Sequence, residues 1–127
     1  MKGGRTPTRE GVAITIRLRF GEKAALGHGK VRLLELIGTH GSIAAAGRAM
    51  GMSYRRAWML VDEVNAMFRE PLVVKQTGGS HGGGATLTAC GARVIEHYRN
   101  MEHALSVSAA DEINALLALS AKDSEAH

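Results

Sequence analysis

Four consecutive polar side chains, at Ser53, Tyr54, Arg55 and Arg56, are the most chemically suggestive group in the sequence. Apolar residues follow them at three- and four-residue spacing, which predicts a helix that Ser53 caps and whose first turn is exposed. A hydroxyl, a phenol and two guanidinium groups suit phosphates and base edges, because arginine can donate two parallel hydrogen bonds to O6 and N7 of guanine. The pattern therefore favours contact with a DNA major groove.

The predicted helix, residues 53–68, has two distinct faces. Its apolar face consists of Ala57, Leu60, Val61, Val64 and Phe68. Its opposite face and edges carry Tyr54, Arg55, Arg56 and Met59. One face would thus pack on a core while the other stays accessible to a ligand. Trp58 follows the inward-pointing Ala57, so we expect its indole to pack at the edge of the helix rather than to contact a base.

A shorter helix, capped by the hydroxyl of Ser42, is predicted immediately before it. Its apolar face comprises Ile43, Ala46, Ala49 and Met50. Its alanines and glycine make it thin, so a second helix can cross it closely. Gly51 follows where the chain needs a positive φ, and Met52 would fill the turn. Residues 41–68 predict a helix-turn-helix, although this pattern alone fits a generic α-helical hairpin equally well.

A β-hairpin with a glycine-rich tip is predicted directly after the two helices. Pro71 ends the second helix, Leu72–Lys75 is a short strand with β-branched residues, and Thr86–Thr88 is its partner. Residues 76–85 include five glycines, whose backbone N–H groups can approach phosphates closely. Such a hairpin predicts a DNA-binding wing, and the alternative is a loop without any contact. The residues that we expect to contact DNA are Ser42, Ser53, Tyr54, Arg55, Arg56, Met59, Lys75, Thr77, Ser80, His81, Gly82 and Gly83.

Three further segments are predicted before the helix pair. Residues 1–11 are expected to form a flexible basic arm. Apolar and polar residues alternate over Val12–Phe20, which is typical of a half-buried strand. Lys30–His40 is an amphipathic helix that would complete a three-helix core. The connection between them is expected to include a helical turn near Lys23–Leu26.

A long last helix is predicted from its cap at Thr88 to about Leu119. Its apolar stripe consists of Val94, Tyr98, Met101, Leu105, Ile113, Leu116 and Leu117. A three-helix core has little need of another 30 residues of helix, so the stripe is expected to meet a second copy of the chain. The alternative is a helix, broken near residues 106–110, that folds back over its own core.

Charge is unevenly distributed along the chain. The formal net charge is +4, with +8 in residues 1–61 and −4 in residues 62–127. The basic half contains the exposed helix turn, so the asymmetry favours a polyanionic partner. Aromatic residues make up 4% of the chain, which makes base stacking on single strands a poor explanation for the basic charge.

Length and cysteine content limit the number of domains and the cellular compartment that the sequence fits. A chain of 127 residues is one domain's worth, with a single modest core. Cys90 is the only cysteine, which excludes an internal disulfide and fits a reducing compartment. No apolar run approaches the length of a membrane span and the start lacks a signal-peptide core, so a cytoplasmic location is expected.

Candidates for catalysis or metal binding are few. Gly27–Lys30 (GHGK) resembles a phosphate loop only superficially, because its surroundings do not fit that motif's spacing. Cys90 lies near a predicted helix start, but a small buried thiol explains it better than a nucleophile does. His97 and His103 are six residues apart, not the three or four that would place two ligands on one helix face. We therefore expect no enzyme activity, no cofactor and no metal.

The sequence resembles the N-terminal DNA-binding domain of the ModE family of molybdate-responsive transcriptional regulators. The resemblance is carried by Gly41–Trp58 (GSIAAAGRAMGMSYRRAW), the continuation LVDEVN, and Lys75–Gly91 (KQTGGSHGGGATLTACG), and it covers roughly residues 12–105. It implies a winged helix-turn-helix of LysR-like type, mainly α with a small antiparallel sheet. The family's recognition helix falls on Ser53–Phe68 and its wing on Lys75–Thr86.

The resemblance also implies a function: a sequence-specific transcriptional regulator that binds an inverted-repeat operator as a homodimer. The expected organisation is a basic arm at 1–11, a winged DNA-binding domain at 12–88, a dimerisation helix at 89–119 and a tail at 120–127. ModE proteins continue into molybdate-binding domains for which this sequence has no counterpart, so molybdate binding is not expected. Two alternatives stay open, a winged helix that docks another protein and an architectural protein that binds DNA without sequence preference.

Overall fold

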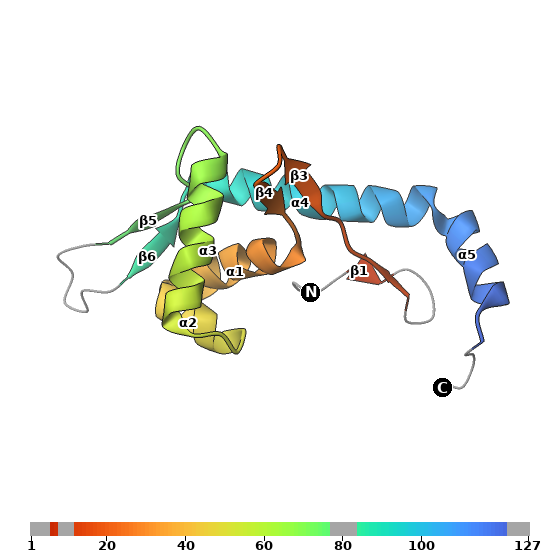
Figure 1. The fold of residues 1–127 in the computed structure, drawn as a ribbon, viewed down its shortest axis with the longest axis horizontal. Helices are drawn as coiled ribbons and strands as arrows, with labels where there is room; N and C mark the ends of the chain where they lie inside the picture. Colours follow the sequence, from red (N-terminus) through yellow and green to blue (C-terminus); the bar gives the residue numbers. More distant parts are fainter. Residues whose placement is uncertain (1–5, 8–11, 77–83, 122–127) are drawn as a thin grey trace.

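Three helices pack against one another at one end of the molecule (Figure 1). The computed structural model describes residues 6–7, 12–76 and 84–121. The three helices are α1 (His28–His40), α2 (Ile43–Ala49) and α3 (Tyr54–Met67). The buried residues of their inward faces include Val31, Leu33, Leu34, Ile37, Ile43, Ala46, Ala57, Val61 and Val64. The predicted three-helix core is therefore confirmed, with α1 beginning two residues earlier than expected.

Local signals in the sequence set the ends of these helices. Gly41 ends α1 with a φ of 74°, and Gly51 turns the chain between α2 and α3 with a φ of 72°. The Ser42 hydroxyl accepts a hydrogen bond of 3.0 Å from the N–H of Ala45, and the Ser53 hydroxyl accepts one of 3.1 Å from the N–H of Arg56. Both serine caps and the turn glycine are as predicted.

α2 and α3 cross closely because the residues between them are small. A Cβ atom added to the buried Gly47 would lie 3.0 Å from the Cβ of Ala57 and 3.6 Å from Cγ of Met52. Met52 itself is half-buried and packs against the core, as expected of a residue inside the turn. The position of α3 relative to the rest of the protein thus depends on a glycine–alanine contact.

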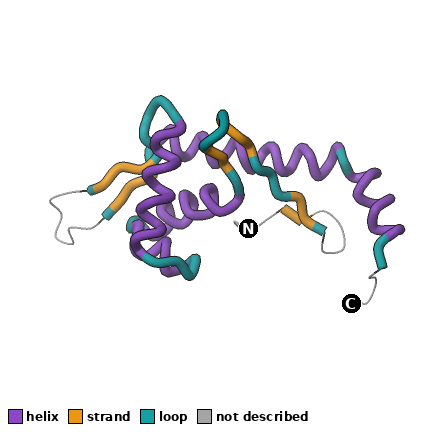
Figure 2. The backbone as a smooth tube through the Cα atoms, viewed as in Figure 1, coloured by secondary structure: helices purple, strands orange, loops and turns teal. Residues whose placement is uncertain are grey.

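A two-stranded antiparallel sheet follows α3. β5 (Val73–Lys75) pairs with β6 (Ala85–Leu87), with Val73 opposite Leu87. The hairpin lies beside α3 at the far side from the N-terminal strands (Figure 2). Its strands confirm the predicted hairpin, whereas its tip, residues 77–83, falls outside the described part of the chain.

The segment before α1 differs from its prediction in two places. Instead of one strand over Val12–Phe20, two short strands form: β2 (Ala13–Ile14) pairs with β1 (Thr6–Pro7), and β3 (Leu18–Phe20) pairs with β4 (Ala24–Leu26). The strand is interrupted where the Ile16 carbonyl accepts a 2.6 Å hydrogen bond from the hydroxyl of Tyr98 on a later helix.

β4 also corrects the helical turn predicted at Lys23–Leu26. Gly21 has a φ of 75°, which turns the chain back on itself so that residues 24–26 pair with β3. The alternation of exposure along residues 12–19 nevertheless follows the predicted pattern, with Ile14, Ile16 and Leu18 half-buried.

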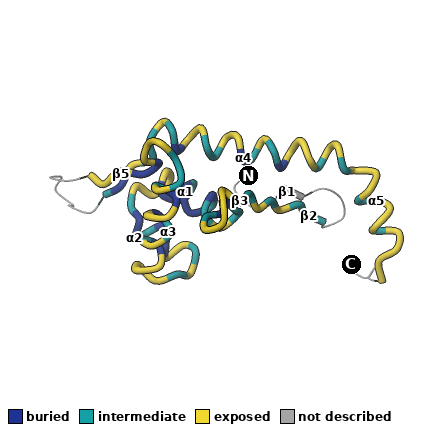
Figure 3. The backbone as a smooth tube through the Cα atoms, turned by 45° about the horizontal axis from the view of Figure 1, so that its top comes forward, coloured by how far each residue is buried: buried dark blue, intermediate teal, exposed yellow. Residues whose placement is uncertain are grey.

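The predicted last helix is two helices. α4 (Ala89–Ser108) is capped by Thr88, whose hydroxyl accepts a hydrogen bond of 2.9 Å from the N–H of Gly91. α5 (Ala110–Leu119) follows a break at Ala109 and contains no buried residue. α4 extends away from the three-helix core and α5 turns off its end (Figures 1 and 3), so the pair does not fold back over the core. Among the described helices, none has the length and apolar character needed to cross a membrane.

Candidate nucleic-acid interface

The first turn of α3 is open to solvent. The exposed fractions of Tyr54 and Met59 are 59% and 48%, and Arg55 and Arg56 are also exposed. Within the described part of the chain, neither arginine takes part in an ion pair. The hydroxyl of Ser53 is engaged in capping the helix, so two unpaired guanidinium groups and a phenol are what this turn presents to a partner.

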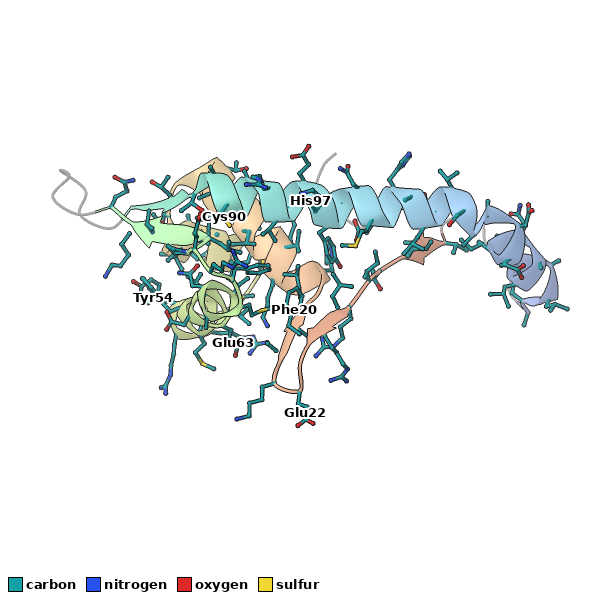
Figure 4. The ribbon with its side chains drawn as sticks, turned by 90° about the horizontal axis from the view of Figure 1, so that it is seen from above. Phe20, Glu22, Tyr54, Glu63, Cys90 and His97 are labelled. Atoms are coloured by element: carbon teal, nitrogen blue, oxygen red, sulfur yellow. The ribbon has the colours of Figure 1, made fainter. Side chains whose placement is uncertain are left out.

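One flank of α3 faces the wing. The Trp58 and Tyr54 rings form an edge-to-face pair with centroids 6.2 Å apart, and Nζ of Lys75 lies 5.2 Å from the centroid of the Trp58 ring. Tyr54 projects from this side of the helix, as Figure 4 shows. Trp58 is half-buried and packs against the core, at the edge of the helix where the sequence placed it. The contact between Trp58 and Lys75 thereby joins α3 to β5.

Asn65 holds the base of the wing to α3. Its Oδ1 accepts hydrogen bonds from the N–H groups of Leu72 and Val73, at 2.7 and 3.1 Å, and its Nδ2 donates one of 3.0 Å to the carbonyl of Val73. Sequence reasoning missed this role, although an asparagine next to the apolar face of a predicted helix is a usable signal, because polar groups near a core need hydrogen-bond partners. The side chain satisfies backbone groups at the point where the chain leaves the helix and enters the wing.

The start of α4 contacts the same segment, Pro71 and Leu72, where the chain enters the hairpin. The Thr88 hydroxyl donates to the carbonyls of Pro71 and Leu72, at 2.9 and 3.2 Å. A Cβ atom added to Gly91 would lie 2.5 Å from the carbonyl oxygen of Leu72, a distance no larger side chain allows. The β5–β6 hairpin is therefore fixed to α3 on one side and to α4 on the other.

A charged network that the sequence did not indicate joins α1 to α4. The guanidinium of Arg99 donates to both carboxylate oxygens of Glu35, each at 2.9 Å, and to Oε1 of the buried Glu102 at 2.8 Å. Burial alone would raise the pKa of Glu35, but hydrogen bonds and charge from Arg99 and Arg32 outweigh it and hold that pKa below its ordinary value. The hydrogen bonds to Glu35 in turn raise the pKa of Arg99, and burial raises the pKa of Tyr98.

The other residues predicted to contact DNA fall into two groups. Ser42 is half-buried and serves as the cap of α2, whereas Lys75 is exposed at the start of the wing. The remaining wing residues lie outside the described part of the chain: Thr77, Ser80, His81, Gly82 and Gly83.

The residues predicted to form a dimer fall into two groups, one packed in the core of its own chain and one accessible to a partner. Tyr98 has no exposed surface and is a core residue of its own chain, which removes it from the predicted stripe. Val94 and Met101 are half-buried and pack against the same core. By contrast, Leu105 and Leu116 have exposed fractions of 43% and 67%. The accessible part of the stripe is thus its distal half, completed by the half-buried Ile113 and Leu117.

Residues considered for other chemistry lie apart. Cys90 is half-buried at the start of α4 and packs against the core, while His97 is exposed further along that helix (Figure 4). Within the described ranges, no three His, Cys, Asp or Glu side chains are grouped so that they could hold a metal ion.

Two capped helices that cross at a glycine turn, with a third helix behind them and a β-hairpin beside the second, define a mainly α winged helix-turn-helix. The sequence is 44% identical over 78 residues to the molybdenum transport protein ModE of Azotobacter vinelandii. It is 42% identical over 81 residues to the molybdenum-pterin-binding protein MopA of Rhodobacter capsulatus. It is 36% identical over 85 residues to the DNA-binding transcriptional dual regulator ModE of Escherichia coli strain K12.

These matches cover 61 to 67% of this chain and 29 to 32% of the relatives, so the chain spans about a third of their length. No family model matches the chain. Over the matched residues the chain is a homologue of the ModE proteins, which confirms the resemblance noted from its sequence.

Proposed function

We propose that the protein is a sequence-specific, DNA-binding regulator of transcription. The observation that carries the proposal is the exposed first turn of α3, where Arg55 and Arg56 lie beside Tyr54 and form no ion pair with any residue that the structure describes. Guanidinium groups on the first turn of such a helix reach base edges in the major groove. The name of the E. coli relative, a DNA-binding transcriptional regulator, supports the same function.

In this proposal the wing supplies contacts that fix orientation rather than sequence. Lys75 is the exposed last residue of β5, and its ammonium lies over the Trp58 ring of α3. The glycine-rich tip would add backbone N–H groups to the phosphate contacts. The wing and α3 would therefore contact the same duplex together.

We further propose that the regulator acts as a homodimer on an inverted repeat. Four apolar residues on α4 and α5 support this, because all four are exposed on a single chain: Leu105, Val107, Leu116 and Leu119. Pairing two chains through α5 would cover such side chains, and two-fold symmetry would present two copies of α3 to two half-sites.

The test is in vitro selection of random duplex DNA by the purified protein at about physiological salt, followed by sequencing of the bound pool. Enrichment of a two-fold symmetric motif is the expected result. A bound pool that stays random would refute sequence-specific regulation and favour an architectural protein. Failure to retain any duplex would favour a winged helix that docks another protein.

A further inference from the structure

A cleft of about 420 Å³ lies on the flank of α3 opposite the wing. One wall is a stripe of α3 that includes Arg56, Leu60 and Glu63, spaced four and three residues apart. The other wall is the β3–β4 hairpin, with Arg19 and Lys23. Figure 4 shows Glu63 on the side of α3 that faces this hairpin. The recognition helix is therefore flanked by one hairpin on each side.

The lining of the cleft is strongly basic. Five basic side chains line it, Arg17, Arg19, Lys23, Lys30 and Arg56, against the acidic Glu22 and Glu63.

The two acidic side chains only partly offset the positive charge of the five basic ones. The carboxylate of Glu63 is paired with Lys30 at 3.2 Å, and the same ammonium donates to the carbonyl of Ala25 at 2.7 Å. Glu22 lies at the tip of the hairpin, away from α3 (Figure 4). The other four basic groups form no ion pair within the described ranges of the chain.

The floor of the cleft adds to this charge. Gly27, His28 and Gly29, at the start of α1, line it. α1 has no side-chain hydrogen bond at its cap, Gly27, and no acidic residue in its first turn, so the N-terminal end of its helix dipole adds a partial positive charge. The GHGK segment that does not fit a phosphate loop thus lies where a strand passes into a helix, facing arginines from two other elements.

We propose that this cleft binds a phosphate group. Guanidinium groups from the hairpin and from α3 converge on one space with a helix start beneath it, which is the donor set that phosphate oxygens require. The phosphate has two possible sources, the backbone of a bound duplex or a free phosphorylated compound. In the first case the inference rests on the proposed function, and the β3–β4 hairpin acts as a second clamp opposite the wing.

The experiment uses a double variant of the hairpin, R19A/K23A, and a control, R69A/R93A, that removes the same charge from exposed residues outside the cleft. Pyrophosphate is titrated calorimetrically into each protein at low ionic strength. Binding of random-sequence duplex is measured as a function of salt for the same proteins. Thermal unfolding of each variant confirms that it is folded.

We expect the affinity for pyrophosphate to fall by at least about tenfold in R19A/K23A but not in the control. If the duplex supplies the phosphate, the slope of log affinity against log salt also becomes shallower by about 1 to 2. A weaker pyrophosphate affinity with an unchanged slope assigns the site to a free phosphorylated compound, and a shallower slope alone assigns it to DNA.

The proposal is overturned if neither quantity responds to R19A/K23A more than to R69A/R93A. Its failure is distinguishable from failure of the proposed function. A wild-type protein that binds no duplex refutes the regulator, whereas the pyrophosphate titration still decides whether the cleft holds phosphate.

Discussion

Neighbouring residues of α3 have three different surroundings, and this divides their roles. Ala57 has no exposed surface and touches α2, Trp58 packs toward the wing, and Arg56 lines the cleft beside β3–β4. Arg55 belongs to none of these contacts and points to solvent. It is therefore the side chain of the first turn that is freest to contact a base.

Replacing Arg55 with alanine tests this role. A bidentate contact to guanine would be lost, so we expect binding to the selected site to weaken by about 1–3 kcal/mol and preference to relax at one base pair per half-site. The measurement is a titration of selected and single-substituted sites, with R93A on α4 as the control. Unchanged affinity and selectivity would show that Arg55 does not contact a base.

Asn65 gives a prediction about stability rather than binding. In N65A the N–H groups of Leu72 and Val73 lose their acceptor. A buried donor without an acceptor lowers the stability of the folded state by about 1–3 kcal/mol. We expect the free energy of unfolding in urea to fall by about that amount. N100A removes an exposed asparagine from α4 and should change it by less than about 0.5 kcal/mol. Equal effects of both variants would contradict the structural role of Asn65.

Among the elements, α4 makes the most varied contacts. Its first turn packs against the wing at Leu72, Tyr98 donates to the break between β2 and β3, and Arg99 reaches α1. The helix thus holds the wing, the N-terminal strands and the helical core in one arrangement. Disturbing its link to α1 should weaken the whole fold.

The link between Glu35 and Arg99 predicts how stability depends on pH. The pKa of Glu35 is lowered in the folded protein, so its contribution to stability is fully present above the ordinary pKa of a glutamate and is lost as the pH falls through the lower, folded-state pKa. We expect E35Q to be less stable than the wild type at neutral pH, with a difference that shrinks as the pH falls below the ordinary pKa of a glutamate. Urea unfolding at a series of pH values measures this, and a difference independent of pH would contradict it.

Local and distant interactions explain which elements the sequence could predict. Ser42, Ser53 and Thr88 cap helices through N–H groups three residues away, so their patterns were sufficient. The break in the predicted strand at Ile16 depends on Tyr98, 82 residues later, and no local pattern contains that information. Arg99 likewise pairs with a carboxylate 64 residues away. The exposed turn of α3 was predictable because it follows from helical spacing alone, whereas the basic cleft needs three elements to be placed in space.

At the scale of the whole molecule, the described chain has a packed end and an exposed end. The three-helix core and β5 lie at one end, and α5 lies at the other (Figure 3). The cleft is lined by residues of α1, α3 and the β3–β4 hairpin, so it belongs to the packed end. α5 buries no residue in its own chain, yet carries the largely exposed Leu116 and Leu119. This separation keeps the proposed dimer contact apart from the proposed DNA contact.

Substitutions on α5 test the dimer without altering the core. L116E places a charge in the exposed apolar stripe, and we expect it to shift the protein toward monomer in sedimentation equilibrium because a buried unpaired charge opposes association. A115E adds the same charge to an exposed position outside the stripe and should leave the association unchanged. A wild-type protein that is monomeric throughout, or an equal effect of both variants, would contradict pairing through α5.

The length of α4 has a geometric consequence for the target. Its 20 residues correspond to about 30 Å of rigid rod between the wing and α5. In the proposed dimer joined at α5, each copy of α4 would separate the dimer contact from its own α3. The length of α4 would therefore set the distance between the two copies of α3. The spacing between half-sites that the protein accepts would then depend on the length of α4 rather than on any residue that contacts a base.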